Sequence, residues 1–174
     1  MPNDAVTALL NGGFVVSCQA PTDSPMHHPD VIAAMAETAI LRGAVGVRIE
    51  SPDHVKAVRS RLSAPIIGLW KQQIPDFDVY ITPQAHHANA IAQAGADIIA
   101  IDATQRPRPD GETLRSLVDY IHHELNRPVM ADIDTLENAL IAIDAGVDSV
   151  GTTLYGYTGD THNQTPPGFD LLAA

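Results

Sequence analysis

The sequence predicts an α/β protein whose parallel sheet is built from about six βα units. Short apolar runs of strand length alternate with stretches of helix length along the 174 residues. The run Ile98–Ile101 is apolar at every position, which is typical of a parallel strand covered on both faces. Gly43, Gly95 and Gly146 each end a predicted helix and lead into a strand. Their spacing gives roughly 26 residues per βα unit, so six units account for nearly all of the chain.

Six strands are expected at the apolar runs. Glycine precedes the first, second, fourth and sixth strands, whereas Pro65 and Pro128 introduce the third and fifth, as proline does at the start of a strand. A brief extended piece, Val79–Thr82, lies between the third and fourth strands. The expected strands are Phe14–Ala20, Val45–Glu50, Ile66–Lys71, Ile98–Ile101, Val129–Ile133 and Ser149–Thr153.

Capping residues and prolines mark where the helices between these strands begin. His28 and Pro29 open the first helix, and Pro83 opens the third. Asp110 and Asp134 are expected to be N-caps, because each acid precedes a helical pattern and Asp134–Glu137 has the form of a capping box. The expected helices cover residues 28–43, 51–62, 83–95, 111–125 and 134–145, and a further helix begins near 166–172.

The composition indicates one domain, covering residues 1–174, with a substantial core. A chain of this length buries roughly 70% of its unfolded surface. The formal net charge is −11 and the ten Lys and Arg form no basic stripe, which argues against nucleic acid as a partner. The single cysteine, an N-terminus without a basic region and the lack of an apolar run near ~20 residues favour a cytoplasmic protein without a membrane partner.

Two architectures fit this pattern of units. One is a complete doubly wound sheet, and the other is a barrel that lacks its last quarter. An eight-unit barrel with this period needs ~210 residues, which is more than the 174 present. The pattern alone does not choose between the two.

A set of motifs spread over nearly the whole chain is more specific than the order of strands and helices. The Arg-Pro-Arg-Pro-Asp-Gly block and the Gly-Thr-Thr-Leu-Tyr-Gly-Tyr-Thr run are the most distinctive. Together the motifs resemble the bacterial N-acetylmannosamine-6-phosphate 2-epimerases. This resemblance implies a TIM (β/α)8-type barrel, here expected to be incomplete with about six βα units. The motifs are Ser17–Ala20, Gly43–Arg48, Ile66–Lys71, Val79–Pro83, Ala96–Gly111, Met130–Thr135 and Val150–Thr158.

The resemblance also implies an isomerase of amino-sugar metabolism. The family interconverts N-acetylmannosamine 6-phosphate and N-acetylglucosamine 6-phosphate during the breakdown of sialic acid (N-acetylneuraminate), without a metal or organic cofactor. The family's reactive lysine falls on Lys71, and its substrate-binding residues fall on Gln19, Arg48 and Asp132. The expected partner is therefore a small phosphorylated N-acylhexosamine, and no cofactor and no metal are expected.

The sequence departs from the family in its C-terminal part. The family's catalytic glutamate comes from strand seven, and its phosphate-binding residues come from the loops after strands seven and eight; none of these is found in the sequence. The alternative function is therefore an inactive or sugar-phosphate-binding remnant of such a barrel. A barrel of six units has two edge strands with unpaired backbone, which a homodimer would cover.

Epimerisation next to a hemiacetal has definite chemical requirements. The ring opens, the α-proton is removed, and a proton returns on the opposite face, so two proton-transfer groups flanking a planar enolate are the simplest design. A lysine serves when part of it is neutral, a state that burial or nearby cations favour. Asp102 or Asp132 would then have to replace the absent glutamate. Arg48 is suited to hold substrate oxygens or to stabilise the enolate.

Three further charged residues have both a functional and a structural interpretation. Asp102 ends the buried fourth strand, and Arg106 and Arg108 follow it, so all three are candidates for contact with an anionic ligand. The two arginines fit an ion-pair network with Asp110 and Glu112 equally well.

The remaining candidates also have simpler explanations. Arg48 has Glu50 and Asp53 nearby as alternative partners, and Gln19 has the loop backbone. Neighbouring residues on a helix point about 100° apart, and no HxxxH spacing occurs among the paired histidines, so we expect solvated pairs rather than a metal site. These pairs are His27-His28, His86-His87 and His122-His123.

Overall fold

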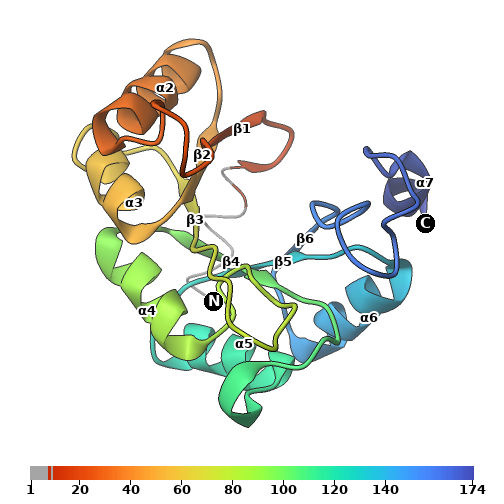
Figure 1. Cartoon of the computed structure of the whole chain (residues 1–174). Helices are drawn as coiled ribbons and strands as arrows, with labels where there is room; N and C mark the ends of the chain where they lie inside the picture. The colour runs from red at the N-terminus through yellow and green to blue at the C-terminus, as the bar shows by residue number, and fades with distance from the viewer. Residues whose placement is uncertain (1–7, 9) are drawn as a thin grey trace.

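The computed structural model describes residue 8 and residues 10–174, which form one curved parallel sheet with helices outside it (Figure 1). Every strand pairs with its neighbour in the sequence, in the order β1-β2-β3-β4-β5-β6. A doubly wound sheet reverses its strand order at a switch point, whereas a barrel does not. The barrel-type prediction is therefore confirmed, and the doubly wound alternative is wrong. The strands are β1 (Val15–Cys18), β2 (Gly46–Glu50), β3 (Ile66–Leu69), β4 (Ile98–Asp102), β5 (Val129–Asp132) and β6 (Ser149–Gly151).

The helices between the strands lie on the convex side of the sheet, and α7 follows β6 after a long loop (Figure 1). No helix of the described residues combines the length and the apolar character needed to cross a membrane. The helices are α2 (Pro29–Leu41), α3 (Pro52–Arg59), α4 (Ala85–Ala94), α5 (Leu114–His123), α6 (Leu136–Ala145) and α7 (Phe169–Ala173), with a 3-10 turn η1 (Pro109–Gly111) before α5.

The predicted glycine joints are present at all three positions. Gly43, Gly95 and Gly146 have φ angles of 97°, 107° and 95°, in the region that favours glycine, and each lies between a helix and the next strand. The joints therefore turn the chain from the helical layer back into the sheet at three equivalent places.

Apolar side chains cover both faces of the sheet. Strand side chains alternate between faces, so Ile49 and Ile99 pack among the helices, whereas Ile67 and Ile98 belong to a second cluster with Leu154 from the loop after β6. Polar residues interrupt this second cluster at the carboxyl ends of the strands, where Asp102 and Asp132 are adjacent partners on β4 and β5. The fold thus concentrates its buried charge at that end of the sheet.

Two predicted caps are wrong for the same reason. Thr113 caps α5 in a capping box with Ser116, and Thr135 caps α6 by accepting a hydrogen bond from the Asn138 amide. Asp110 instead lies in η1 with a φ of 57°. A threonine closer to each helix takes the capping position, so the acid is released for other contacts.

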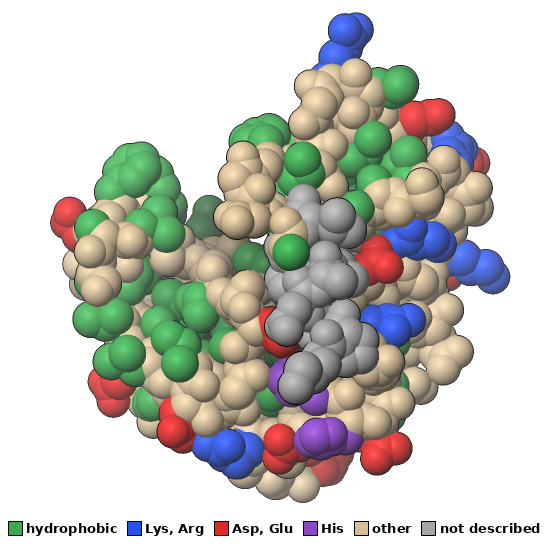
Figure 2. Space-filling view, turned by 180° about the vertical axis from the view of Figure 1, so that it is seen from behind, with side chains coloured by type: hydrophobic (Ala, Val, Ile, Leu, Met, Phe, Trp, Pro, Cys, Tyr) green, Lys and Arg blue, Asp and Glu red, His purple; other side chains and the backbone are tan. Residues whose placement is uncertain are grey.

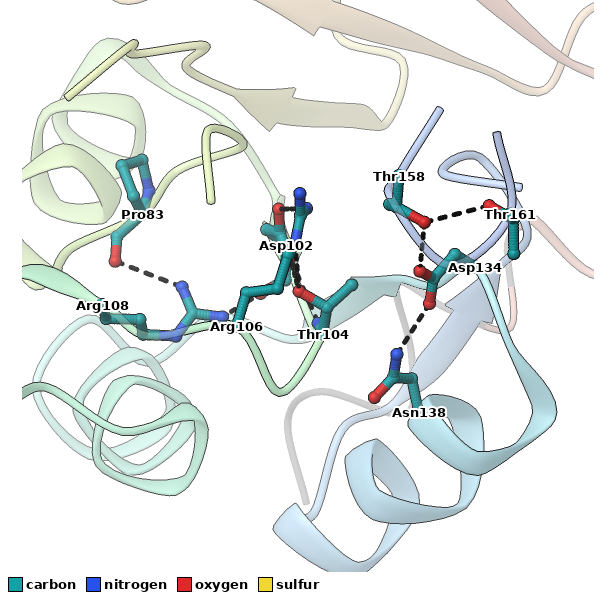
Figure 3. Close-up of polar contacts among 9 residues, drawn as sticks. All are labelled: Pro83, Asp102, Thr104, Arg106, Arg108, Asp134, Asn138, Thr158 and Thr161. Carbon is teal, nitrogen blue, oxygen red and sulfur yellow. Dashed lines mark hydrogen bonds and ion pairs between the residues drawn. The ribbon is translucent and has the colours of Figure 1, made fainter. Parts of the chain in front are cut away.

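Asp134, which does not cap α6, holds the loop after β6 in place through hydrogen bonds. Its buried carboxylate accepts hydrogen bonds from Asn138 Nδ2 at 2.7 Å and from Thr158 Oγ1 at 2.6 Å (Figure 3). The Thr158 hydroxyl is also 2.9 Å from the Thr161 hydroxyl. This network joins the start of α6 to the threonine-containing loop that precedes α7.

Several strands end earlier than predicted. β3 ends at Leu69 rather than Lys71, because Lys71 instead pairs antiparallel with Ile81 from the loop before α4. β5 ends at Asp132, and β6 ends at Gly151. The segments beyond these ends form the loops that surround the polar end of the sheet.

Hydrophobic side chains remain exposed beside the last strand. Within the described residues, β6 pairs only with β5, as β1 pairs only with β2. Leu136, Leu140 and Ile143 on α6 are 43%, 59% and 59% exposed. Figure 2, which views the molecule from behind, shows hydrophobic surface gathered on the side of the molecule that holds α6 and α7. The homodimer expected from open sheet edges stays a prediction.

Candidate functional site

The centre of the polar end is an ion pair between Arg48 of β2 and Asp132 of β5. Arg48 Nη1 donates to Asp132 Oδ1 at 2.9 Å, and Arg48 Nη2 donates to Asp132 Oδ2 at 2.5 Å. The Asp132 side chain is fully buried and the Arg48 side chain is 11% exposed. The structural alternatives for Arg48, pairing with Glu50 or Asp53, are therefore wrong. A bidentate pair fixes the guanidinium plane and holds its positive charge inside the curved sheet.

Lys71 and Gln19 form a second pair at the same end of the sheet. Lys71 Nζ donates to Gln19 Oε1 at 2.9 Å, and the Gln19 amide donates to Ser17 Oγ at 2.9 Å. Gln19 therefore binds two side chains and does not satisfy loop backbone. The exposed Lys71 contributes with Gln19 to the wall of a cavity of about 440 Å³. Cavities of this size accommodate small ligands. Its walls are Gln19, Ala20, Pro21, Thr22, Glu50 and Lys71.

The four residues that the resemblance singled out are thus brought together as two pairs. Arg48 lies within β2 rather than at its end, Gln19 follows β1 directly, and Lys71 follows β3 by two residues. Asp132 is the last residue of β5. Gln19, Lys71 and Asp132 thus lie at or just beyond the carboxyl ends of their strands, the end where barrel proteins bind ligands, and the Arg48 side chain reaches Asp132 there.

The pKa of Tyr80 is influenced by the charges of two arginine–carboxylate pairs, Arg48–Asp132 and Arg106–Asp102. Burial raises the pKa of the Tyr80 phenol, the carboxylates Asp102 and Asp132 raise it further, and Arg106 and Arg48 oppose them. The Tyr80 carbonyl accepts a hydrogen bond from the Gln72 amide, next to Lys71. Sequence reasoning did not single out this tyrosine, and its only signal was its position in the brief extended piece before α4.

Asp102 belongs to a closed hydrogen-bond network with Thr104 and Arg106 (Figure 3). Its Oδ1 accepts from the Thr104 amide at 3.1 Å and from the Thr104 hydroxyl at 2.7 Å. Its Oδ2 accepts from Arg106 Nη2 at 2.7 Å, and Arg106 Nε donates to the Thr104 hydroxyl at 2.9 Å. The carboxylate is fully buried, and each of its oxygens accepts a hydrogen bond from a residue of the loop that follows β4.

Arg108 holds the backbone of the site together. Its side chain donates to the Pro83 carbonyl at 3.2 Å and to the Asp102 carbonyl (Figure 3). Burial lowers the pKa of Arg108, while the carboxylates Asp102 and Glu112 act in the opposite direction. The predicted ion pairs of the two arginines with Asp110 and Glu112 are not formed. Asp110 instead accepts from Gln84 Nε2 at 2.8 Å, and Glu112 accepts from the Ala85 amide at 3.1 Å.

A second cavity, of about 500 Å³, lies beside the Asp102 network. Its walls are polar, and Arg106 is the one arginine among them, with a side chain that is 19% exposed. Arg106 is therefore the better placed of the two loop arginines to meet an anionic group. The walls are Thr104, Gln105, Arg106, Thr135, Glu137, Asn138 and Asp160.

The sequence suggested that the paired histidines are all solvated, and this expectation is wrong for part of the set. His28, His86 and His123 are exposed, but His87 is buried against Trp70. His122 Nε2 is 2.8 Å from Asp148 Oδ2. Two residues of one pair point in different directions on a helix, so one of them reaches the interior.

A group of three possible metal ligands was also missed. His27, Glu50 and His54 lie near one another, and Glu50 also lines the first cavity. Burial and the neighbouring His27 lower the pKa of His54, while the Glu50 carbonyl, the Glu50 carboxylate and Asp53 oppose this shift. The signal in the sequence was the spacing of four residues between Glu50 and His54 across the start of α3, but His27 comes from a distant loop.

Fold and site together define a class of protein. A parallel sheet in barrel order, with a lysine, an amide and an arginine–carboxylate pair near the carboxyl ends of its strands, is typical of (β/α)-barrel proteins that bind small polar ligands. The family model described as "Putative N-acetylmannosamine-6-phosphate epimerase" matches residues 32–174. The chain belongs to this family of N-acetylmannosamine-6-phosphate epimerases.

Individual relatives agree with this assignment. The chain is 61% identical over 164 residues to a "Putative N-acetylmannosamine-6-phosphate 2-epimerase" of Synechococcus elongatus, covering 94% of this chain and 71% of the relative. A relative of the same name in Cutibacterium acnes is 40% identical over 171 residues, covering 98% and 74%. The solved N-acetylmannosamine-6-phosphate 2-epimerase from Clostridium perfringens has a TM-score of 0.91 at 36% identity, covering 95% of this chain and 72% of that one.

Proposed function

We propose that this chain interconverts N-acetylmannosamine 6-phosphate and N-acetylglucosamine 6-phosphate, as an N-acylglucosamine-6-phosphate 2-epimerase of sialic-acid breakdown in the cytoplasm. The observation that carries the proposal is the hydrogen bond of Lys71 to Gln19 in the wall of the first cavity. An amine held at the carboxyl end of a barrel, in a cavity that suits a small ligand, is well placed for proton transfer. Membership of the epimerase family supports the same substrate class.

The reaction assigns a separate role to each of the four residues. Lys71 exchanges the C2 proton of the open-chain sugar, and Gln19 orients the Lys71 amine through its amide oxygen. Arg48 offers a fixed positive charge to the oxygen that becomes negative in the enolate. Asp132 keeps Arg48 in place, because its two oxygens accept both guanidinium donors.

Neither buried aspartate is suited to serve as the second proton-transfer group. Asp102 accepts from Thr104 and Arg106, and Asp132 accepts from Arg48. Both oxygens of each aspartate already accept hydrogen bonds from donors of the chain, so neither carboxylate is free to replace the family's glutamate. The curated relatives and the solved neighbour all bear the epimerase name, which favours an epimerase over an inactive or sugar-phosphate-binding remnant.

Exchange of the C2 proton in heavy water tests the proposal. Nuclear magnetic resonance should detect deuterium at C2 of N-acetylmannosamine 6-phosphate together with formation of the other epimer. Lys71→Met should slow exchange by about 100-fold or more, because it removes a group that transfers a proton. Lys56→Met, which removes an exposed lysine on α3, is the matched control and should exchange like the parent.

Two outcomes would reject the proposal. One is the absence of exchange in the parent under conditions where the Clostridium perfringens relative exchanges. The other is unchanged exchange in Lys71→Met. If the parent shows no exchange, binding of the sugar phosphate can still be measured by the broadening of its phosphorus resonance. Binding without exchange would identify a binding protein rather than an enzyme.

A further inference from the structure

Three residues with metal-binding side chains lie near one another, and one of them, Glu50, also lines the Lys71 cavity. His27 lies in the loop between β1 and α2, Glu50 ends β2, and His54 lies in the first turn of α3. One ligand atom from each residue lies within 4.8 Å of those of the other two. The fold assembles this group from two separate segments, so it is not a product of neighbouring positions in the chain.

Backbone carbonyls hold both imidazoles in one orientation. His27 Nδ1 is 2.9 Å from the Ala20 carbonyl, and His54 Nδ1 is 3.0 Å from the Glu50 carbonyl. A nitrogen that bonds a carbonyl must carry the hydrogen, so Nε2 of each neutral ring keeps a free lone pair. Neither Nε2 makes a hydrogen bond within the part of the chain that the structure describes. A histidine that binds a metal commonly donates its other ring nitrogen to a backbone carbonyl in this way.

The surroundings fix His54 firmly. The residue is 3% exposed, and its backbone amide donates to the hydroxyl of Ser51, the N-cap of α3. The ring of His27 meets the ring of His54 edge-on, with centroids 4.6 Å apart. A histidine that served only to fill the core would need no second imidazole and no carboxylate beside it. Their convergence points to a positive ligand.

We propose that His27, Glu50 and His54 form a site for a divalent transition metal ion of the zinc type, bound through Nε2 of both imidazoles and the Glu50 carboxylate. Two histidines and a carboxylate with a fourth position for water are a known zinc ligand set. Bonds of about 2.0–2.2 Å would bring the three ligand atoms closer than 4.8 Å, so His27 and Glu50 would have to turn toward the fixed His54 when the ion binds. Mg²⁺ and Ca²⁺ fit poorly, because they prefer oxygen ligands.

Metal binding by His27, Glu50 and His54 would affect the cavity that contains Lys71. Glu50 lines the same cavity as Lys71 and Gln19, and Glu50 Oε1 lies 3.4 Å from the Lys71 amide nitrogen. A bound ion would fasten the loop that follows Gln19 to the start of α3. The metal would therefore fix one wall of the cavity without taking part in proton transfer at Lys71.

Titration of the metal-free 174-residue chain, made without a histidine tag, tests the site. Calorimetry with Zn²⁺ should give one ion per chain, and Co²⁺ should give the absorption bands of a tetrahedral or five-coordinate ion. His27→Gln and Glu50→Gln should each weaken Zn²⁺ binding by at least 10-fold. His123→Gln, which removes an exposed histidine on α5, is the matched control and should bind like the parent. Mg²⁺ should produce no signal.

His27 and Glu50 are chosen because neither is fully buried, so their variants should fold; far-ultraviolet circular dichroism checks this. Zn²⁺ should also raise the melting temperature of the parent and of His123→Gln, but not that of His27→Gln. The proposal is overturned if the parent binds no stoichiometric Zn²⁺, or if His27→Gln and Glu50→Gln both bind it as tightly as the parent. These readouts involve no turnover, so their failure leaves the epimerase proposal untouched.

Discussion

At the scale of single residues, His87 shows how the interior sets the charge state of a side chain. Its ring packs edge-on against Trp70, with centroids 5.4 Å apart, and its Nδ1 is buried without a hydrogen-bond partner among the described residues. Burial, with a smaller effect from His86, lowers the pKa of His87 to about 4. The folded protein therefore keeps this ring neutral at pH values where the unfolded chain has already bound a proton.

The lowered pKa of His87 predicts a pH-dependent stability. Between the folded pKa of about 4 and an unfolded value near 6.5, the unfolded state binds more protons, so stability rises with pH. The contribution is complete above about pH 6.5 and is lost as the pH falls toward 4; its size is roughly 2–3 kcal/mol. Urea unfolding at pH 5 and pH 7.5 measures it. His87→Phe should reduce the difference between the two pH values, whereas the exposed His86→Gln should keep most of it. An equal difference in parent and His87→Phe would refute the prediction.

The sequence identified the polar residues of the site better than their partners. Lys71, Gln19, Arg48 and Asp132 were singled out by motif, and they do lie toward one end of the sheet. Their pairing could not be predicted, because Arg48 and Asp132 are 84 positions apart and meet only when the sheet curves. The bonds of Asp102 likewise depend on how the loop at Thr104 turns.

At the scale of elements, the three glycine joints are alike in conformation but differ in their surroundings. A Cβ atom on Gly43 would meet nothing within 4 Å, whereas one on Gly95 would lie 2.8 Å from Arg59 Cγ. Arg59 has no freedom to withdraw, because its guanidinium donates to the carbonyls of Gly95 and Leu62 and pairs with Asp97. A side chain at Gly95 would therefore meet a steric clash as well as an unfavourable backbone conformation. A side chain at Gly43 would meet only the unfavourable conformation.

This difference predicts unequal costs for the same substitution. Gly43→Ala should destabilise the protein by about 1 kcal/mol, the usual cost of a left-handed conformation for a residue with a Cβ. Gly95→Ala should cost roughly 1–3 kcal/mol more, because the methyl group displaces Arg59. Chemical denaturation of the two variants side by side measures the difference. Equal losses of unfolding free energy would mean that Arg59 adapts without cost.

Local sequence rules predicted some ends of the helices correctly and others wrongly. The glycine joints were predictable because a left-handed residue is a local requirement. The caps were misassigned because aspartate and threonine both cap helices, and only tertiary contacts decide which one does. Asp134 is drawn into bonds with Asn138 and Thr158, which leaves Thr135 as the cap.

At the scale of the whole molecule, repeat spacing fixed the number of βα units but not how they associate. A doubly wound sheet and a barrel use the same units, and they differ only in which strands become neighbours. The continuous order from β1 to β6 curves the sheet, so that the inner faces of distant strands approach each other (Figure 1). Residues from β2 and β5, which are not adjacent strands, then touch across the interior.

The contact of Arg48 with Asp132 makes this curvature testable. Removing either partner leaves the other as a buried, unpaired charge, so Arg48→Met and Asp132→Asn should each destabilise the fold. Arg48→Met should cost about 3 kcal/mol and Asp132→Asn less, because the Arg48 side chain is 11% exposed and asparagine keeps an acceptor oxygen for it. The double variant removes both charges, and its loss should therefore be at least 1 kcal/mol smaller than the sum of the single losses. Urea denaturation of the four proteins at pH 7.5 gives the coupling energy. Strictly additive losses would contradict a direct contact, and β2 and β5 would then not be held together across the sheet by this pair.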